Sequence, residues 1–135
     1  MSLSVAAFTM ARNEDTFLPI WVRHYGDALG RAHLFVIDDN SSDGSTEGLG
    51  EVNLIRLEPA PFDEEKRALT VSLMLHELLK FYDVVIFSDV DELLVVEPLL
   101  KLGLRDYIAR HAGLHTNAIG LNVIHNWFEE PPYTP

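Results

Sequence analysis

Residues 84–92 read Val-Val-Ile-Phe-Ser-Asp-Val-Asp-Glu, so a short apolar run passes directly into an acidic segment. A continuous apolar run of this length, rich in β-branched and aromatic residues, is typical of a strand that is buried on both faces of a sheet. The same pattern occurs at residues 33–39, and residues 3–14 likewise pass from an apolar run into the polar segment Arg12-Asn13-Glu14. Three buried strands that each end in polar residues predict a mostly parallel sheet whose carboxyl-terminal edge is polar.

Segments with helical periodicity separate these strands. One helix is expected to open at the acids near residue 14, a second at residues 63–65, and a third at Pro98. Further strands are expected at residues 52–57 and 118–124. The alternation predicts an α/β fold with a Rossmann-like, mostly parallel sheet flanked by helices. The apolar helix faces comprise Leu18, Trp21, Val22, Tyr25 and Leu29 in the first helix, Ala68, Val71, Leu75, Leu78 and Tyr82 in the second, and Leu100, Leu104, Tyr107, Ile108 and His111 in the third.

The composition indicates one globular domain and excludes several classes of function. The 135 residues carry 10 basic and 21 acidic side chains, for a net charge of −11, and 47% are hydrophobic. This acidity argues against nucleic acid and anionic membranes as partners, but permits a phosphorylated small molecule that a cation bridges. The absence of cysteine excludes disulfides, zinc-thiolate sites and thiol catalysis. No apolar run approaches the ~18 residues of a membrane span and no basic leader is present, so we expect a cytoplasmic protein.

Asp89 and Asp91 form the strongest candidate site. Two carboxylates spaced i, i+2 just beyond a strand can converge on one hard cation, and Mg²⁺ or Mn²⁺ prefers such oxygen ligands. The metal would neutralise a diphosphate as it leaves. The alternative is a solvated acidic turn.

Two further loops are expected at the same sheet edge, because ligands of such sheets bind beyond the carboxyl ends of the strands. In residues 38–45, Asp38 or Asp39 could accept hydrogen bonds from a ribose or a base, although the loop could also be a surface turn with Asx and Ser caps. After the first strand, Arg12 and Asn13 could reach a base or phosphate, and Asn13 could equally be a helix cap. Arg67 could meet a diphosphate or remain a solvated charge.

Taken together, these motifs resemble those of the family 2-like glycosyltransferases. Ala11-Arg12-Asn13-Glu14, residues 36–45 and Phe87-Ser88-Asp89-Val90-Asp91-Glu92 occur in that family's order and rough spacing. The acids followed by Leu93-Leu94-Val95-Val96 are similar to its bacterial branch. The resemblance covers residues 4–126 and implies a GT-A nucleotide-sugar-binding domain at 4–128, the N-terminal donor-binding half of a longer transferase, with a terminal loop at 129–135.

The resemblance implies a metal-dependent transferase that uses Mn²⁺ or Mg²⁺. It would move a sugar from a nucleoside-diphosphate sugar, often a UDP-sugar, to an unidentified saccharide, lipid or protein acceptor, with inversion at the anomeric carbon. Asp91 would bind the metal, and Asp89 would bind the metal or the ribose. The nucleotide-sugar site so implied comprises Ala11, Arg12, Asn13, Glu14, Asp38, Asp39, Asp43, Arg67 and Asp89.

The chain also departs from the family pattern. Family members continue into a second half that holds the acceptor site and the catalytic base, so we expect a sheet incomplete at its C-terminus and name no catalytic residue. Trp127 and Phe128 could stack on a sugar ring or pack against a missing element, and the second alternative makes a homo-oligomer possible. Two other functions stay open: a nucleotide-sugar-binding module without turnover, and a receiver-type signalling domain phosphorylated at Asp89.

Overall fold

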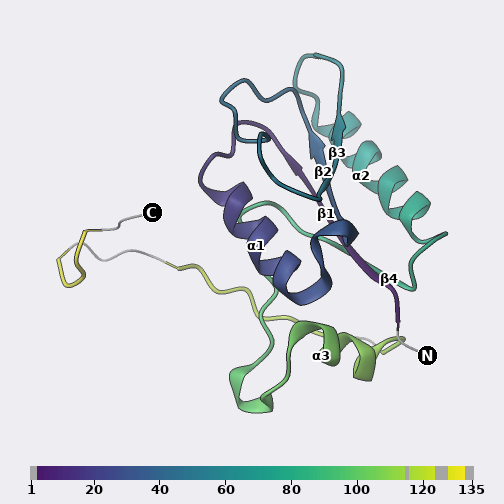
Figure 1. Ribbon diagram of the computed structural model, residues 1–135, viewed down its shortest axis with the longest axis vertical. Coiled ribbons are helices and arrows are strands. Elements are labelled where there is room, and N and C mark those ends of the chain that lie inside the picture. Colours follow the sequence, from purple (N-terminus) through teal and green to yellow (C-terminus); the bar gives the residue numbers. More distant parts are fainter. Residues whose placement is uncertain (1–2, 115, 124–127, 133–135) are drawn as a thin grey trace.

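The computed structural model describes residues 3–114, 116–123 and 128–132. Its centre is a four-stranded, all-parallel sheet with the strand order β3-β2-β1-β4 (Figure 1). The strands are β1 (Val5–Ala11), β2 (Leu34–Asp38), β3 (Asn53–Arg56) and β4 (Val84–Phe87). The expected α/β fold with a parallel sheet is therefore confirmed.

Helices cover both faces of this sheet. They are α1 (Phe17–Leu29), α2 (Glu64–Leu78) and α3 (Leu104–His111), together with the short 3₁₀ turns η1 (Arg31–His33) and η2 (Pro98–Leu100). The helices α1 and α3 pack on one face and α2 on the other, which gives three layers (Figure 1). In the part of the chain that the structure describes, none of the helices combines the length and the apolar character that crossing a membrane requires.

The two faces of the sheet are filled by alternate residues of each strand. In β1, Ala7 packs toward α1 whereas Phe8 and Met10 pack toward α2, and all seven residues of the strand are buried. Alternation of this kind follows from the two-residue repeat of a β-strand. The five apolar residues expected on α1 are all buried. The helix α2 packs through the expected Val71, Leu75 and Leu78, whereas Ala68 is exposed. Tyr82 packs in the same cluster but follows the end of the helix.

Two of the three helices, α1 and α3, begin later in the sequence than predicted. Asn13 has a left-handed φ of 55°, which a helix cannot continue through, so α1 begins at Phe17 and not at the preceding acids. Pro98 opens only the turn η2, because Lys101 adopts a φ of 50° and ends it. The helix α3 begins at Leu104, and Leu100 is half exposed.

The fifth strand predicted at 118–124 is wrong for residues 118–123, which form no strand in the structure; residue 124 lies outside the described residues, as does Trp127. A strand needs a neighbour to receive its backbone hydrogen bonds, and this segment leads away from the sheet beyond α3 (Figure 1). Its alternating Ile119, Leu121 and Val123 are accordingly between 84% and 99% exposed. Local alternation predicted the strand, but no strand pairs with it.

The strand order creates a topological switch point. From β1 the chain adds β2 and then β3 on one side, and α2 carries it back across to β4 on the other side of β1. The direction in which strands are added therefore reverses between β1 and β4. In open parallel sheets ligands bind in the crevice at this position, so a binding site is expected at the carboxyl ends of β1 and β4.

Asp83 fastens the opposite end of these two strands. Its Oδ2 accepts hydrogen bonds from the backbone N of Ser4 at 2.8 Å and from the Ser4 hydroxyl at 2.7 Å. The backbone N–H and the hydroxyl of Ser4 lower the pKa of Asp83 below its ordinary value, because both donate to the charged form.

This contact predicts an acid-sensitive contribution to stability. A carboxyl group whose pKa is lower in the folded protein stabilises it above the unfolded-state pKa, about 3.9 for Asp, and the contribution is lost as the pH falls through the folded pKa. We expect Asp83→Asn to flatten the fall in melting temperature between about pH 5 and about pH 3. Asp27→Asn, an exposed acid on α1, is the control. Equal acid sensitivity in both variants would contradict the prediction.

Candidate functional site

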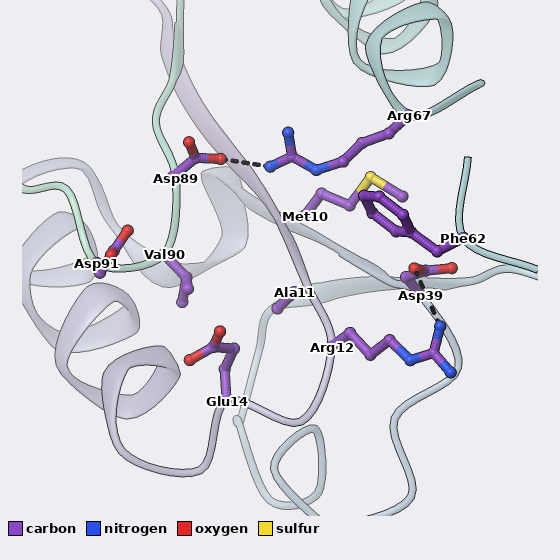
Figure 2. Close-up of a pocket in the computed structure, with 10 residues that line it drawn as sticks. All are labelled: Met10, Ala11, Arg12, Glu14, Asp39, Phe62, Arg67, Asp89, Val90 and Asp91. Atoms are coloured by element: carbon purple, nitrogen blue, oxygen red, sulfur yellow. Dashed lines mark hydrogen bonds and ion pairs between the residues drawn. The ribbon is translucent and has the colours of Figure 1, made fainter. Parts of the chain in front are cut away.

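A pocket of about 240 Å³ lies at the switch point, beyond the carboxyl ends of β1 and β4 (Figure 2). Its lining contains four acids and two arginines, which give it a formal charge of −2. The lining residues are Met10, Ala11, Arg12, Glu14, Asp39, Phe62, Arg67, Asp89, Val90 and Asp91. The structure therefore brings together most of the residues that the sequence singled out, drawn from four separate segments of the chain.

The Asp-Val-Asp triplet divides between the core and the pocket. Val90 is 6% exposed and belongs to the hydrophobic core beneath α1. Asp89 and Asp91, on either side of it, both line the pocket (Figure 2). The backbone N of Glu92 donates to the carbonyl oxygen of Asp89 at 3.0 Å and closes a turn. The buried valine thus anchors a turn that presents two carboxylates to one space.

A buried chain of hydrogen bonds holds the segment around this turn. The indole N–H of Trp21 donates to Ser88 Oγ at 2.9 Å, and Ser88 donates to the hydroxyl of Tyr25 at 3.2 Å. That hydroxyl also accepts from the backbone N of Leu94 at 3.0 Å, while His24 Nε2 lies 2.9 Å from the Leu94 carbonyl. The sequence identified Trp21 and Tyr25 only as core residues. Their side chains did carry a chemical hint of the hydrogen bonds, because a buried indole N–H or phenol hydroxyl needs a polar partner.

Arg67 and Asp89 form the closest ion pair in the pocket. Nη2 of Arg67 lies 2.5 Å from Asp89 Oδ1 (Figure 2). The arginine stands in the first turn of α2, where Asp63 caps the helix by accepting from the backbone N of Glu65 and of Lys66. A second acid, Glu64, lies 3.8 Å from Arg67 Nη1. The capped helix start therefore fixes the base of the arginine, and its side chain reaches across the pocket to the turn after β4.

Arg12 and Asp39 form a looser pair on the opposite wall. Nη1 of Arg12 lies 3.9 Å from Asp39 Oδ2 (Figure 2). The backbone N of Asp39 donates to the Ala11 carbonyl at 2.9 Å, so β1 and β2 stay hydrogen-bonded up to the pocket. Because Arg12 is 45% exposed and the pair is long, the guanidinium remains able to engage an anionic ligand.

Asp38, unlike Asp39, lies outside the pocket. It is 2% exposed, and Oδ1 accepts from the backbone N of Ser41 at 2.8 Å. Oδ2 accepts from the Thr46 hydroxyl at 3.1 Å and lies 3.5 Å from Nε of Arg56. Both oxygens are therefore engaged within the protein, and this carboxylate shapes the loop after β2.

Asn13 and Asp43 also lie outside the pocket. The side-chain oxygen of Asn13 accepts from the backbone N of Ser42 at 2.8 Å, and the backbone N–H of Asn13 donates to Ser41 Oγ at 3.0 Å. It therefore ties two loops together and is not an ordinary helix cap. Asp43 lines a separate hollow of about 350 Å³. Hydrogen bonds from the side chain and the backbone of Ser45 lower the pKa of Asp43.

Phe62 and Met10 line the pocket although no motif in the sequence pointed to them. Phe62 lies between β3 and α2 and is 68% exposed, a large fraction for an aromatic side chain. It lies beside Met10 and Asp39 in the pocket wall (Figure 2). An exposed ring next to a hydrogen-bonding carboxylate offers a flat apolar surface to a ligand, and only the folded arrangement reveals that placement.

Asp89 and Asp91 could hold a divalent cation only with help from a ligand. Among the residues that the structure describes, no three acidic, histidine or cysteine side chains form a metal-binding group. Magnesium and manganese commonly bind one or two carboxylates and take their other ligands from phosphate oxygens and water. Asp89 and Asp91 fit such shared coordination.

Comparison of the chain with protein-family models, curated proteins and solved structures finds no match. The resemblance to glycosyltransferases therefore stays a prediction that depends on the three motifs.

Proposed function

We propose that the pocket binds the nucleoside diphosphate of a sugar donor, together with Mn²⁺ or Mg²⁺, and that the protein is a glycosyltransferase. The observation that carries this proposal is the meeting of Asp89 and Asp91 with two arginines at the switch point of a parallel sheet. The donor would be a UDP-sugar, and the acceptor a saccharide, lipid or protein. The same proposal places the protein in the cytoplasm.

The charges of the pocket support a ligand of this kind. With four acids against two arginines, the pocket repels a free diphosphate. Asp89 and Asp91 would hold a divalent cation, whose charge would offset this repulsion and would stabilise the negative charge on a departing diphosphate. Arg12 and Arg67 then supply the remaining positive charge from the opposite walls.

The roles of the chain's own residues follow from their positions. Asp91 and Asp89 present oxygen atoms to the metal, and Asp39 presents its carboxylate to the ribose or the base. The exposed ring of Phe62 supplies a surface on which a base can stack. The buried chain from Trp21 to Tyr25 holds the turn that carries the two metal-binding acids.

The strand order argues against the receiver-type alternative. In receiver-like sheets the strand that ends in the acidic pair lies directly beside the strand that ends in the phosphorylated aspartate. Here β1 separates β2, which leads to Asp39, from β4, which leads to Asp89. A binding module without turnover uses the same pocket, and the two functions differ in whether the donor is cleaved.

Titration calorimetry tests the proposal. We expect UDP to bind the protein at least about tenfold more tightly with Mn²⁺ than with a chelator, since the metal converts repulsion into attraction. Uridine, which lacks phosphates, serves as the control and should bind independently of metal. Equal binding of UDP in both conditions, or no binding, would refute the proposal. Release of UDP from a set of UDP-sugars with Mn²⁺ then separates a transferase from a binding module.

A further inference from the structure

We propose that Arg67 competes with the divalent cation for Asp89. When a diphosphate arrives, Arg67 releases Asp89 and binds the diphosphate, so the metal enters the pocket together with the nucleotide and not before it. This inference depends on the proposed function, because it assigns an order of binding to that same site. It concerns the closest ion pair in the pocket, between Arg67 Nη2 and Asp89 Oδ1 at 2.5 Å.

The geometry makes the arginine a direct competitor of the metal. A guanidinium at hydrogen-bonding distance occupies one lone pair of Asp89 that a cation would use, and its charge repels a cation at the other oxygen. Asp91 alone then remains for the metal. One carboxylate is a weak site for a cation that prefers several oxygen ligands.

The same ion pair can be opened. The side chains of Arg67 and Asp89 are 29% and 43% exposed, so water compensates each charge when they separate. Glu64 lies 3.8 Å from the other terminal nitrogen of Arg67, so the guanidinium keeps an anionic neighbour when it leaves Asp89. Because arginine binds phosphate with two parallel hydrogen bonds, a diphosphate in this pocket is a stronger partner than a single carboxylate oxygen.

Arg12 provides a matched control within the same pocket. Its carboxylate neighbour is Asp39, which is 3.9 Å away, and both residues lie on the wall opposite the Arg67–Asp89 pair. Removing either arginine deletes one positive charge from the pocket and so attracts a cation generally. Only removal of Arg67 also frees a carboxylate oxygen of the Asp89–Asp91 pair. The difference between the two variants therefore measures direct competition.

The test is Mn²⁺ binding to the whole chain, measured from the free-ion signal in electron paramagnetic resonance without nucleotide. We expect Arg67→Gln to tighten Mn²⁺ binding by roughly fivefold relative to Arg12→Gln, the order that a partly exposed ion pair contributes. Arg67→Lys retains a charge at this position and should remain close to the wild type. Equal Mn²⁺ affinity in Arg67→Gln and Arg12→Gln would overturn the inference.

A second arm adds UDP and separates this inference from the proposed function. In the wild type, UDP should tighten Mn²⁺ binding, and this coupling should shrink in Arg67→Gln because Asp89 is already free and the diphosphate has lost a partner. If UDP leaves Mn²⁺ binding to the wild type unchanged, the proposed function fails. If UDP acts equally on wild type and Arg67→Gln, the function stands and the inference fails.

Discussion

Saturating UDP with Mn²⁺ is expected to raise the melting temperature of the protein by on the order of 10 °C, and Asp91→Asn is expected to remove most of that increase. A ligand at 100 times its dissociation constant, bound only to the folded state, stabilises by roughly 2.7 kcal/mol. Asp91 lines the pocket beside Asp89, and an amide replaces its charge with a weaker oxygen ligand. Thermal unfolding followed by circular dichroism measures both effects.

The same substitution should act differently without ligand. Asp91 is exposed and shares the pocket with three other acids, so removing its charge should leave the melting temperature unchanged or raise it slightly. Asp27→Asn removes an equal charge from the exposed surface of α1 and should keep the full ligand-induced shift. If Asp91→Asn also keeps that shift, Asp91 is not a metal ligand.

The adjacent Asp38 and Asp39 are expected to differ in which property they support: Asp38 matters more for stability and Asp39 more for nucleotide binding. Asp38→Ala should lower the free energy of unfolding by about 2–3 kcal/mol, since it leaves the buried Thr46 hydroxyl and the backbone N–H of Ser41 without their acceptor. Asp39→Ala should cost less stability, because the Asp39 side chain is 22% exposed and its ion pair is long. Chemical denaturation provides both values.

Nucleotide binding should show the reverse order. We expect Asp39→Ala to weaken UDP binding by roughly tenfold, the effect of losing a hydrogen bond to a charged group. Asp38→Ala should weaken it less when measured at a temperature where the variant is fully folded. A larger binding loss from Asp38→Ala than from Asp39→Ala would show that the buried carboxylate contacts the ligand, contrary to the structure.

Most of the fold could be predicted from local patterns. The strand at residues 84–87 and the buried face of α1 follow from short apolar runs and helical spacing, which the structure reproduces. The strand at 118–123 could not be judged in this way, because a β-strand exists only with a partner and the sequence does not show which edges are available. The start of α1 was missed because the left-handed Asn13 depends on its contacts with Ser41 and Ser42.

The sequence contained more information about the site than the motifs alone. Strand residues alternate between faces, so Asp38 shares the side of Val36, toward α1, and Asp39 shares the side of Ile37, toward α2. That rule separates the buried carboxylate from the pocket carboxylate. The pairing of Arg67 with Asp89 and the position of Phe62 lay beyond prediction, because they depend on how α2 and the loop before it sit on the sheet.

The hydrogen bond between Trp21 and Ser88 gives the protein a built-in optical reporter. The indole is fully buried, and its N–H is bonded to the residue immediately before Asp89. A displacement of the acidic turn therefore changes the polarity around the ring and with it the wavelength of its emission. Replacing the second tryptophan, Trp127, with phenylalanine leaves Trp21 as the sole indole fluorophore. A ligand that displaces this turn can then be followed in real time without an attached dye, and stopped-flow mixing can compare its arrival with that of the metal.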